Sequence, residues 1–159
     1  IYGIQAAIDA GEIVIISVPY AMAAEISQRF AGSLRGKVVI DITNPLTHQP
    51  ADGSSGAQIT ARAIGDGARV VAAFKTNFAS TITDPKDSSG EPREVHYAGD
   101  DEEAKQAVAE LISGIGFKPV DYGTLADAVA LDHMVPLLIR LDREIHAASG
   151  KSSFRLSGP

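Results

Sequence analysis

Three short runs of apolar, mostly β-branched residues define the first half of the chain. They cover residues 12–18, 37–43 and 69–74, and each contains consecutive Val or Ile residues. Near-continuous runs of this kind are typical of strands that are buried on both faces, as in a parallel sheet. The sequence therefore predicts three buried strands in this part of the chain.

Segments with helical spacing lie between and before these runs. At the start of the chain, Ile1, Ile4, Ala7 and Ile8 fall on one helical face, and Gly11 ends the segment. This pattern predicts a helix that precedes the first strand.

The next helix is expected directly after the first strand. Pro19 fits the first turn of a helix, where its missing N–H costs nothing. Residues 20–33 continue the pattern, with an apolar face formed by Met22, Ile26 and Phe30. A short helix is expected near residues 57–65. Strands that alternate with helices imply βαβ crossovers and a mainly parallel sheet.

The second half continues this alternation. Residues 95–99 predict a fourth strand, and the helix after it carries the clearest signals in the chain. Asp100 is the expected N-cap and Glu103 follows three residues later. The apolar face of this helix is formed by Ala104, Ala107, Val108, Leu111 and Ile112. Gly114 and Gly116 are expected to end it.

A short returning strand at 117–123 and a long helical region at 124–148 complete the pattern. Pro136 lies inside the helical region, so we expect a kink or a break there. The tail, residues 152–159, fits either a last edge strand or a disordered end, and the pattern does not decide between them.

The chain opens with a helix, and no Gly-x-Gly-x-x-Gly motif follows any predicted strand. A doubly wound nucleotide-binding domain usually carries that loop in its first βα turn. Either the fold is not of the nucleotide-binding type, or its opening βα units lie outside this sequence.

Composition narrows the class of protein. The 159 residues are typical of one domain. They include 14 Lys and Arg against 20 Asp and Glu, and the basic residues form no cluster, which argues against a nucleic-acid partner. Cysteine is absent, so thiolate chemistry and disulfides are excluded. No apolar stretch reaches the length of a membrane span and no signal peptide opens the chain, so we expect no membrane partner.

Unusual chemistry follows three of the predicted strands. Their ends read Ser17-Val18-Pro19-Tyr20, Thr43-Asn44-Pro45 and Phe74-Lys75-Thr76-Asn77. The carboxyl ends of parallel strands share one edge of a sheet, and ligands bind at that edge. Three such ends together predict a binding crevice, although each alone also fits an ordinary strand exit.

Three side chains at these ends have both a functional and a plain interpretation. Asn44 offers a donor and an acceptor suited to a carboxamide or a ribose, or it caps its own loop. Lys75 meets a phosphate or carboxylate, or it is a solvated surface charge. Tyr20 stacks on or hydrogen-bonds to a ring-bearing ligand, and Pro19 stiffens the turn before it.

Other polar residues are weaker candidates. The histidines show no metal-ligand spacing with one another; they are His48, His96, His133 and His146. For His133, which follows Asp132, a helix-surface or inter-helix role is favoured. The acidic residues 100–103 fit a charged helix start rather than a metal site. We therefore name no metal ligand and no catalytic residue.

The order of these motifs resembles a known family. The stretches "IVIISVPY", "KVVIDITNPL", "SSGAQI", "RVVAAFKTNFA" and "AGDDEEAKQAVAELISGIGFKPVDYGTL" are similar in sequence and order to the NADPH-dependent coenzyme F-420 reductase family, also called the coenzyme F-420-dependent NADP oxidoreductase family. The resemblance covers residues 5 to 145, and 98–123 is its most specific part. Because members begin with a strand and a glycine-rich turn, we expect the N-terminal glycine-rich βα unit to be missing from this sequence.

The resemblance implies an α/β Rossmann-like, doubly wound fold with NADP(H) along the carboxyl edge of the sheet. It implies that Ser17, Val18, Pro19 and Tyr20 pass along the dinucleotide, and that Thr43, Asn44 and Pro45 lie near the nicotinamide. It implies a second-substrate site at Phe74, Lys75, Thr76 and Asn77. Many members carry Asn or His in place of Lys75. Because this residue belongs to the implied second-substrate site, the difference bears on which hydride acceptor the protein uses.

The implied function is hydride transfer between the nicotinamide and a deazaflavin or flavin-like acceptor, with coenzyme F-420 or a flavin as co-substrate. The alternative is a non-catalytic NAD(P)-binding sensor or regulatory module. We expect a partial Rossmann domain at 1–123 and a C-terminal helical extension at 124–159 packed on it. A homodimer through the C-terminal helices and a cytoplasmic location complete the expectations.

Overall fold

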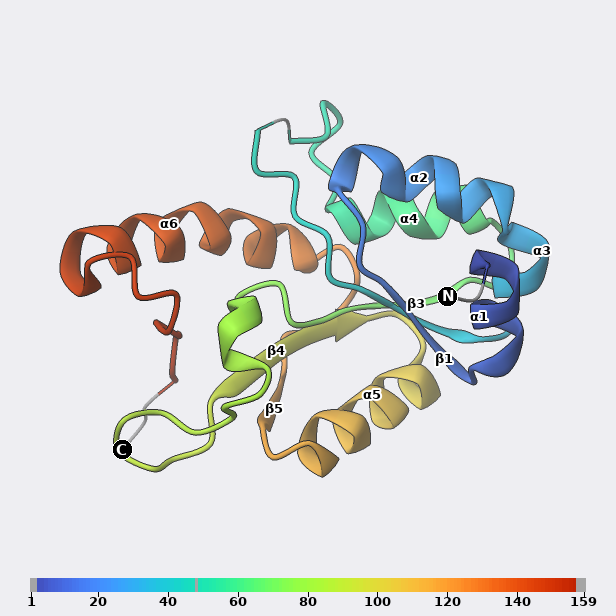
Figure 1. Cartoon of the computed structure of the whole chain (residues 1–159). Coiled ribbons are helices and arrows are strands. Elements are labelled where there is room, and N and C mark those ends of the chain that lie inside the picture. The colour runs from blue at the N-terminus through green and yellow to red at the C-terminus, as the bar shows by residue number, and fades with distance from the viewer. Residues whose placement is uncertain (1–2, 48, 157–159) are drawn as a thin grey trace.

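The computed structural model describes residues 3–47 and 49–156. They form a five-stranded sheet with helices on both faces (Figure 1). The strands are β1 (Ile13–Ile16), β2 (Val38–Asp41), β3 (Arg69–Ala72), β4 (Glu94–Gly99) and β5 (Lys118–Asp121). The helices are α1 (Ile4–Ala10), α2 (Tyr20–Arg29), α3 (Ala31–Leu34), α4 (Gly56–Ile64), α5 (Glu102–Gly114) and α6 (Ala128–His146), with a 3-10 turn η1 (Ala79–Thr81).

The sheet has the spatial order β1-β2-β3-β4-β5. β1, β2 and β3 run parallel, with Ile16 beside Asp41 and Asp41 beside Ala72 at their carboxyl ends. β4 runs antiparallel to β3, and β5 runs parallel to β4. The reversal follows from the connection before β4, which contains only η1 and no crossover helix. The predicted α/β, mainly parallel, Rossmann-like fold is confirmed.

β4 is shared between its two neighbours in a staggered way. Its last residues, Ala98 and Gly99, pair with β3, whereas its first four pair with β5. As a result, β5 is displaced along the sheet and ends near the level of the β3 end, since Tyr97 pairs with Asp121 and the adjacent Ala98 pairs with Ala72.

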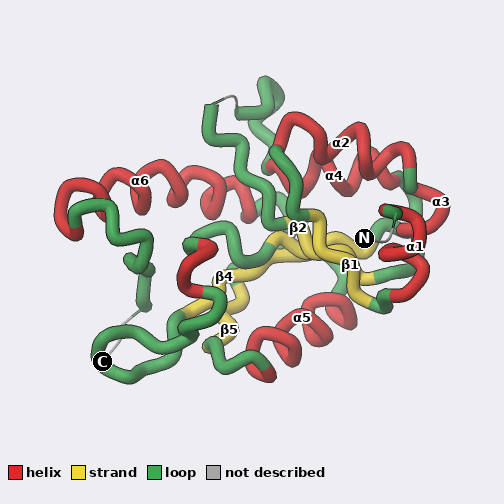
Figure 2. The backbone as a smooth tube through the Cα atoms, in the orientation of Figure 1, coloured by secondary structure: helices red, strands yellow, loops and turns green. Residues whose placement is uncertain are grey.

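Each face of the sheet has its own core. One face, with Val39 and Ala72, packs under α2, α3, α4 and the start of α6. The other, with Ile40 and Val71, packs under α5. The tube drawing shows α5 alone on its side and the remaining long helices on the other (Figure 2). Helices on both faces explain why β2 is completely buried and why all of its residues except Asp41 are apolar.

The prediction that the first strand is buried on both faces was wrong for Ile15, which is 51% exposed. α5 packs mainly on β2 to β5, so the α5 face of β1 stays partly uncovered. The predicted apolar face of α1 has a similar outcome. Ile8 is buried, but Ile4 and Ala7 are exposed, and Ile1 lies outside the described residues.

The predicted apolar face of the second helix was wrong for Met22, whereas Phe30 packs against the core. Met22 is 48% exposed, and the buried positions of α2 are Ala23 and Ser27. α2 packs closely on α4, and small side chains suit that approach. Pro19 occupies the N-cap with extended backbone rather than the first turn, and the helix is interrupted at Phe30 before α3.

Two predictions for α5 have different outcomes. Its apolar face is confirmed, because Ala104, Val108 and Ile112 are fully buried. The N-cap is Asp101 and not Asp100: the Asp101 carboxylate accepts from the Ala104 N–H at 2.7 Å. Asp100 instead accepts from the Leu125 N–H at 2.8 Å. The Asp100 carboxylate thus fixes the connection that leads into α6.

α6 continues through Pro136 without the break that we considered. The chain after it has no regular structure at residues 151–156, so it is not an edge strand there. The Glu94 carboxylate nevertheless accepts from the Leu156 N–H at 2.8 Å and holds this segment against β4. Residues 157–159 lie outside the described part of the chain.

Ser55→Ala is expected to lower the free energy of unfolding by about 1–2 kcal/mol. The Ser55 hydroxyl accepts from the Gln58 N–H in a capping box and also donates to the Leu125 carbonyl. Urea denaturation measures the change. Ser113→Ala is the matched control on the exposed face of α5, where alanine should be neutral or slightly stabilising. Equal stability of the two variants would contradict the role given to the cap.

Candidate functional site

The three predicted segments follow β1, β2 and β3 at the same edge of the sheet. The second and third are joined directly, because the Asn44 amide donates to the Lys75 carbonyl at 3.3 Å. The first approaches the second through Tyr20, whose ring lies with Pro45 against Gly56. The structure therefore brings all three segments to one edge, as parallel strands require.

A small cavity of about 180 Å³ lies at this edge. Its polar wall comes from the strand ends and contains Asn44, Thr76 and Asn77. Its apolar wall comes from α6 and contains Val135, Leu138 and Ile139. The cavity thus lies between the ends of β2 and β3 and the side of α6.

The segment Ser17–Tyr20 does not line this cavity. Ser17 and Pro19 are exposed, and Val18 packs against the core on the α2 side of the sheet. Tyr20 is partly buried, and burial together with the nearby carboxylates of Asp132 and Asp41 raises the pKa of its phenol. The tyrosine therefore presents a neutral hydroxyl.

Two carboxamide oxygens at the cavity are buried without a hydrogen-bond donor among the described residues. They are Asn44 Oδ1 and Asn77 Oδ1. Their amide nitrogens are engaged: that of Asn44 with Lys75, and that of Asn77 with the Glu94 carbonyl at 3.1 Å. Each side chain is thus held in place with its acceptor unused, and a buried unpaired acceptor costs about 1–3 kcal/mol.

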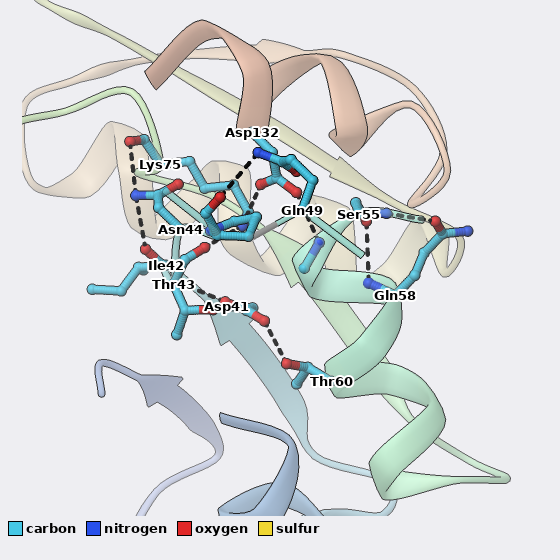
Figure 3. Close-up of polar contacts among 12 residues, drawn as sticks. Asp41, Ile42, Thr43, Asn44, Gln49, Ser55, Gln58, Thr60, Lys75 and Asp132 are labelled. Carbon is cyan, nitrogen blue, oxygen red and sulfur yellow. Dashed lines mark hydrogen bonds and ion pairs between the residues drawn. The ribbon is translucent and has the colours of Figure 1, made fainter. Parts of the chain in front are cut away.

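Lys75 is not a solvated surface charge. Its side chain is fully buried and forms an ion pair with Asp132 of α6, with 2.8 Å between Nζ and Oδ1 (Figure 3). The ammonium also donates to the Thr43 carbonyl. The other carboxylate oxygen of Asp132 accepts from the Gly56 N–H at 2.7 Å. The pair therefore connects the ends of β2 and β3 to the start of α4 and to α6.

Asp132 was missed as a site residue. The sequence does contain a signal, because Asp132 falls on the same helical face as Ala128, Leu131 and Val135, all of which are buried. A carboxylate on an apolar helix face requires a partner. The pattern does not identify that partner, since Lys75 lies on a distant segment.

Asp41, another missed residue, fixes the end of β2. It is fully buried, and its carboxylate accepts from the Thr43 N–H at 2.7 Å and from the Thr60 hydroxyl of α4 at 2.6 Å (Figure 3). Because both carboxylate oxygens are satisfied, Asp41 stabilises the turn that presents Thr43, Asn44 and Pro45.

A buried polar chain extends from the cavity into β4. His96 Nδ1 lies 3.4 Å from the Thr76 hydroxyl, and His96 Nε2 lies 3.5 Å from Glu94. Burial lowers the pKa of His96, and the opposing effect of Glu94 does not restore it. Burial raises the pKa of Glu94, but the bonds from the Leu156 N–H and Lys118 outweigh it, so the net pKa is low. A neutral imidazole therefore lies between Thr76 and an ionised carboxylate.

Phe74 adopts a backbone conformation that non-glycine residues rarely take, with φ of 56°. Such a conformation costs on the order of 1–3 kcal/mol. The ring packs edge-to-face on Phe117 at 6.1 Å, and the Phe74 carbonyl accepts from the Asn77 N–H. These contacts hold the tight turn that places Thr76 and Asn77 at the cavity.

The weaker candidates remain outside this site. His133 and His146 are exposed, and His48 lies outside the described residues. Asp101 and Glu103 pair with Arg69 at the start of α5. Within residues 3–47 and 49–156, no group of three or more His, Cys, Asp or Glu residues is arranged to hold a metal ion.

In the part of the chain that the structure describes, no helix combines the length and the apolar character needed to span a bilayer.

A parallel β1-β2-β3 unit with helices on both faces and a cavity at its carboxyl edge defines a Rossmann-like domain. The family model described as "NADP oxidoreductase coenzyme F420-dependent" matches residues 3–45. The predicted family resemblance is confirmed, and the chain is related to the coenzyme F-420-dependent NADP oxidoreductases.

Individual relatives agree. The F420-dependent NADP reductase of Methanocaldococcus jannaschii is 29% identical over 143 residues, which cover 83% of this chain and 62% of the relative. The enzyme of the same name from Methanothermobacter marburgensis is 31% identical over 151 residues, with 86% and 65% covered. The chain thus spans less than two thirds of the length of each of these two relatives.

The crystal structure of a putative F420-dependent NADP-reductase from Arthrobacter sp. FB24 superposes with a TM-score of 0.86 at 27% identity. The match covers 97% of this chain and 73% of that one. The described fold is therefore similar to that of this crystal structure along almost the entire chain.

Lys75→Met is expected to lower the free energy of unfolding by about 3–5 kcal/mol, because it leaves Asp132 charged and unpaired in the core. In the double variant Lys75→Met/Asp132→Asn, part of this loss should be recovered, since asparagine still accepts from the Gly56 N–H. Denaturant unfolding of the two single variants and the double variant gives the coupling free energy between the two side chains. Additive losses would contradict the ion pair.

Stability should fall as the pH is lowered below about 6.5 because of His96. Its folded pKa lies below the ordinary 6.5, so the unfolded chain takes up the proton first. His96→Gln should reduce the dependence of stability on pH, whereas the non-titrating control Gln106→Ala, on the exposed side of α5, keeps it. Urea titrations at pH 7.5 and 5.5 measure it. Glu94 does not interfere, because its low pKa reduces stability only below about pH 4.5. An unchanged slope in His96→Gln would contradict the assignment.

Proposed function

We propose that this chain is the core of an NADP(H)-dependent oxidoreductase that transfers a hydride between the nicotinamide and a deazaflavin or flavin-like acceptor. The observation that supports this most strongly is the pair of unused carboxamide oxygens, Asn44 Oδ1 and Asn77 Oδ1, at a cavity beside the parallel strand ends. The named activity of the curated relatives agrees with it.

The cofactor is NADP(H), held along the edge formed by the first two segments. Ser17, Val18, Pro19 and Tyr20 border its path, with the exposed Ser17 and Pro19 on the outside. Thr43, Asn44 and Pro45 lie at the nicotinamide end. A carboxamide NH₂ group is the donor that Asn44 Oδ1 lacks. The cavity is smaller than the roughly 300–1,000 Å³ of whole-ligand pockets, so it fits the reacting end and not the entire dinucleotide.

The second substrate, coenzyme F-420 or a flavin, borders Phe74, Lys75, Thr76 and Asn77. Lys75 acts through position, because its charge is already balanced by Asp132. The nicotinamide supplies the hydride when bound, and the protein supplies orientation and excludes water. The lining of the cavity supports this division of roles, since it consists of amides, a hydroxyl, apolar side chains and Lys75, whose charge Asp132 balances.

The same proposal includes the division of the chain into two parts, a homodimer and a cellular location. We place the dinucleotide-binding part at residues 1–123 and the helical extension at 124–159. The exposed apolar residues Leu137 and Ile145 of α6 suit a homodimer contact, and sedimentation at several concentrations tests it. A cytoplasmic location fits a redox enzyme that uses NADPH.

Asn44→Ala in the intact protein is expected to lower kcat/KM for NADPH oxidation about tenfold, as one lost hydrogen bond of about 1–1.5 kcal/mol predicts. Absorbance at 340 nm measures the rate with coenzyme F-420, flavin and ferric acceptors in parallel. Gln106→Ala on the exposed side of α5 is the control.

The outcomes separate the two candidate functions. Oxidation with one acceptor and a specific loss in Asn44→Ala supports the oxidoreductase. Tight NADPH binding without turnover for any acceptor favours the sensor or regulatory module instead. Absence of binding in the intact protein would overturn both.

A further inference from the structure

A second cavity, larger and more polar than the first, lies between the loop before β4 and the chain after α6. It has a volume of about 500 Å³, which is within the usual range for small-molecule pockets. One wall is the loop at 84–88 and the other is the segment at 149–153. In Figure 1 these segments approach each other beyond the end of α6, away from α1, α2 and α3.

Arg93 lies at the base of this cavity and is only 7% exposed. Its guanidinium donates to three neutral acceptors: the Asp84 carbonyl, the Lys151 carbonyl and the Ser153 hydroxyl. Within residues 3–47 and 49–156 it forms no ion pair with a carboxylate, and the acceptors of its hydrogen bonds are all neutral. A buried cation without a counterion is costly, and an anion in the cavity would remove that cost.

The rim of the cavity adds positive charge. Lys86 and Lys151 are exposed and, like Arg93, have no carboxylate partner among the described residues. Two acidic residues also line the cavity, but Asp87 is already paired with Arg155 at 3.5 Å. Asp84 is the remaining opposing charge, so positive charge is in excess.

Hydrogen bonds within the protein hold both walls of the cavity in place. Asp142 of α6 accepts from the Ser149 and Ser152 hydroxyls and from the Gly150 N–H, which fixes the turn after the helix. The bond from Ser152 and its neighbours lowers the pKa of Asp142 well below its usual range. In the opposite loop, Asp87 accepts from the N–H groups of residues 89 and 91. A preformed site loses less entropy on binding.

Hydroxyl groups complete the donor set. The Ser153 hydroxyl accepts from Arg93 and keeps its own proton to donate, and Ser88 faces the same cavity. Guanidinium, ammonium and hydroxyl donors around one pocket are the set that recognises phosphate and carboxylate oxygens. They do not suit an apolar ring or a metal cation.

We propose that this cavity, defined by Arg93, Lys86 and Lys151, is an oxyanion-binding site for a small molecule that carries a phosphate or carboxylate group. It is separate from the strand-end cavity and does not depend on the proposed hydride transfer. The Ser80 hydroxyl of η1 donates to the Gly150 carbonyl, so η1 is connected to the turn after α6. The neighbour of Ser80, Ala79, lines the strand-end cavity.

The test uses ¹⁵N-labelled protein titrated with inorganic phosphate and, separately, with succinate, at constant ionic strength set by chloride. Saturable shifts are expected at the amides of residues 86–88 and 149–153. The double variant Lys86→Gln/Lys151→Gln should lower the affinity for the more tightly bound of the two anions at least tenfold. Both side chains are exposed, so the melting temperature without anion should not change.

The control is Arg29→Gln/Arg35→Gln, which removes the same number of positive charges on α2 and beside α3. It should keep the wild-type affinity. Phosphate binding much tighter than succinate identifies a phosphate site, and the reverse identifies a carboxylate site. Shifts that do not saturate with either anion, or equal weakening in both double variants, would overturn the proposal.

Discussion

The ion pair between Lys75 and Asp132 is the contact on which the strand-end site depends. Both side chains are withdrawn from water, and such a pair is tolerated only when the remaining donors and acceptors are satisfied. The Thr43 carbonyl accepts a hydrogen bond from Lys75, and the Gly56 N–H donates one to Asp132. Because these groups belong to the second strand end and the start of α4, one buried pair fixes four parts of the chain relative to one another.

Neighbouring contacts extend this framework on both sides. Asp41 connects the end of β2 to Thr60 of α4, and the Ser55 hydroxyl connects the start of α4 to the Leu125 carbonyl. The cavity walls are therefore held from the interior of the protein. The side chains that face the cavity, Asn44 and Asn77, are positioned through their amide nitrogens and keep their oxygens free. Such preorganisation is what the proposed orientation of two reacting rings requires.

Local pattern predicted most of the elements, since β2, α4 and the buried face of α5 follow from apolar spacing and caps within each segment. Features set by distant partners were not accessible in this way. The exposure of Ile15, for example, depends on which helix covers β1. In the site, the strand ends were predicted, but Asp132 was missed because its partner lies on another segment.

The staggered pairing of β4 has a consequence for how the fold can vary. Because β4 pairs with both β3 and β5, it sets the position of β5 relative to β3. β5 leads into α6, and α6 supplies Asp132 and the apolar wall of the strand-end cavity. A residue inserted into or deleted from β4 would displace that helix by about 3.3 Å along the sheet and turn alternate side chains to the opposite face. Loops elsewhere tolerate changes in length, but in this domain the distance across the crevice is encoded by the length of a single buried strand.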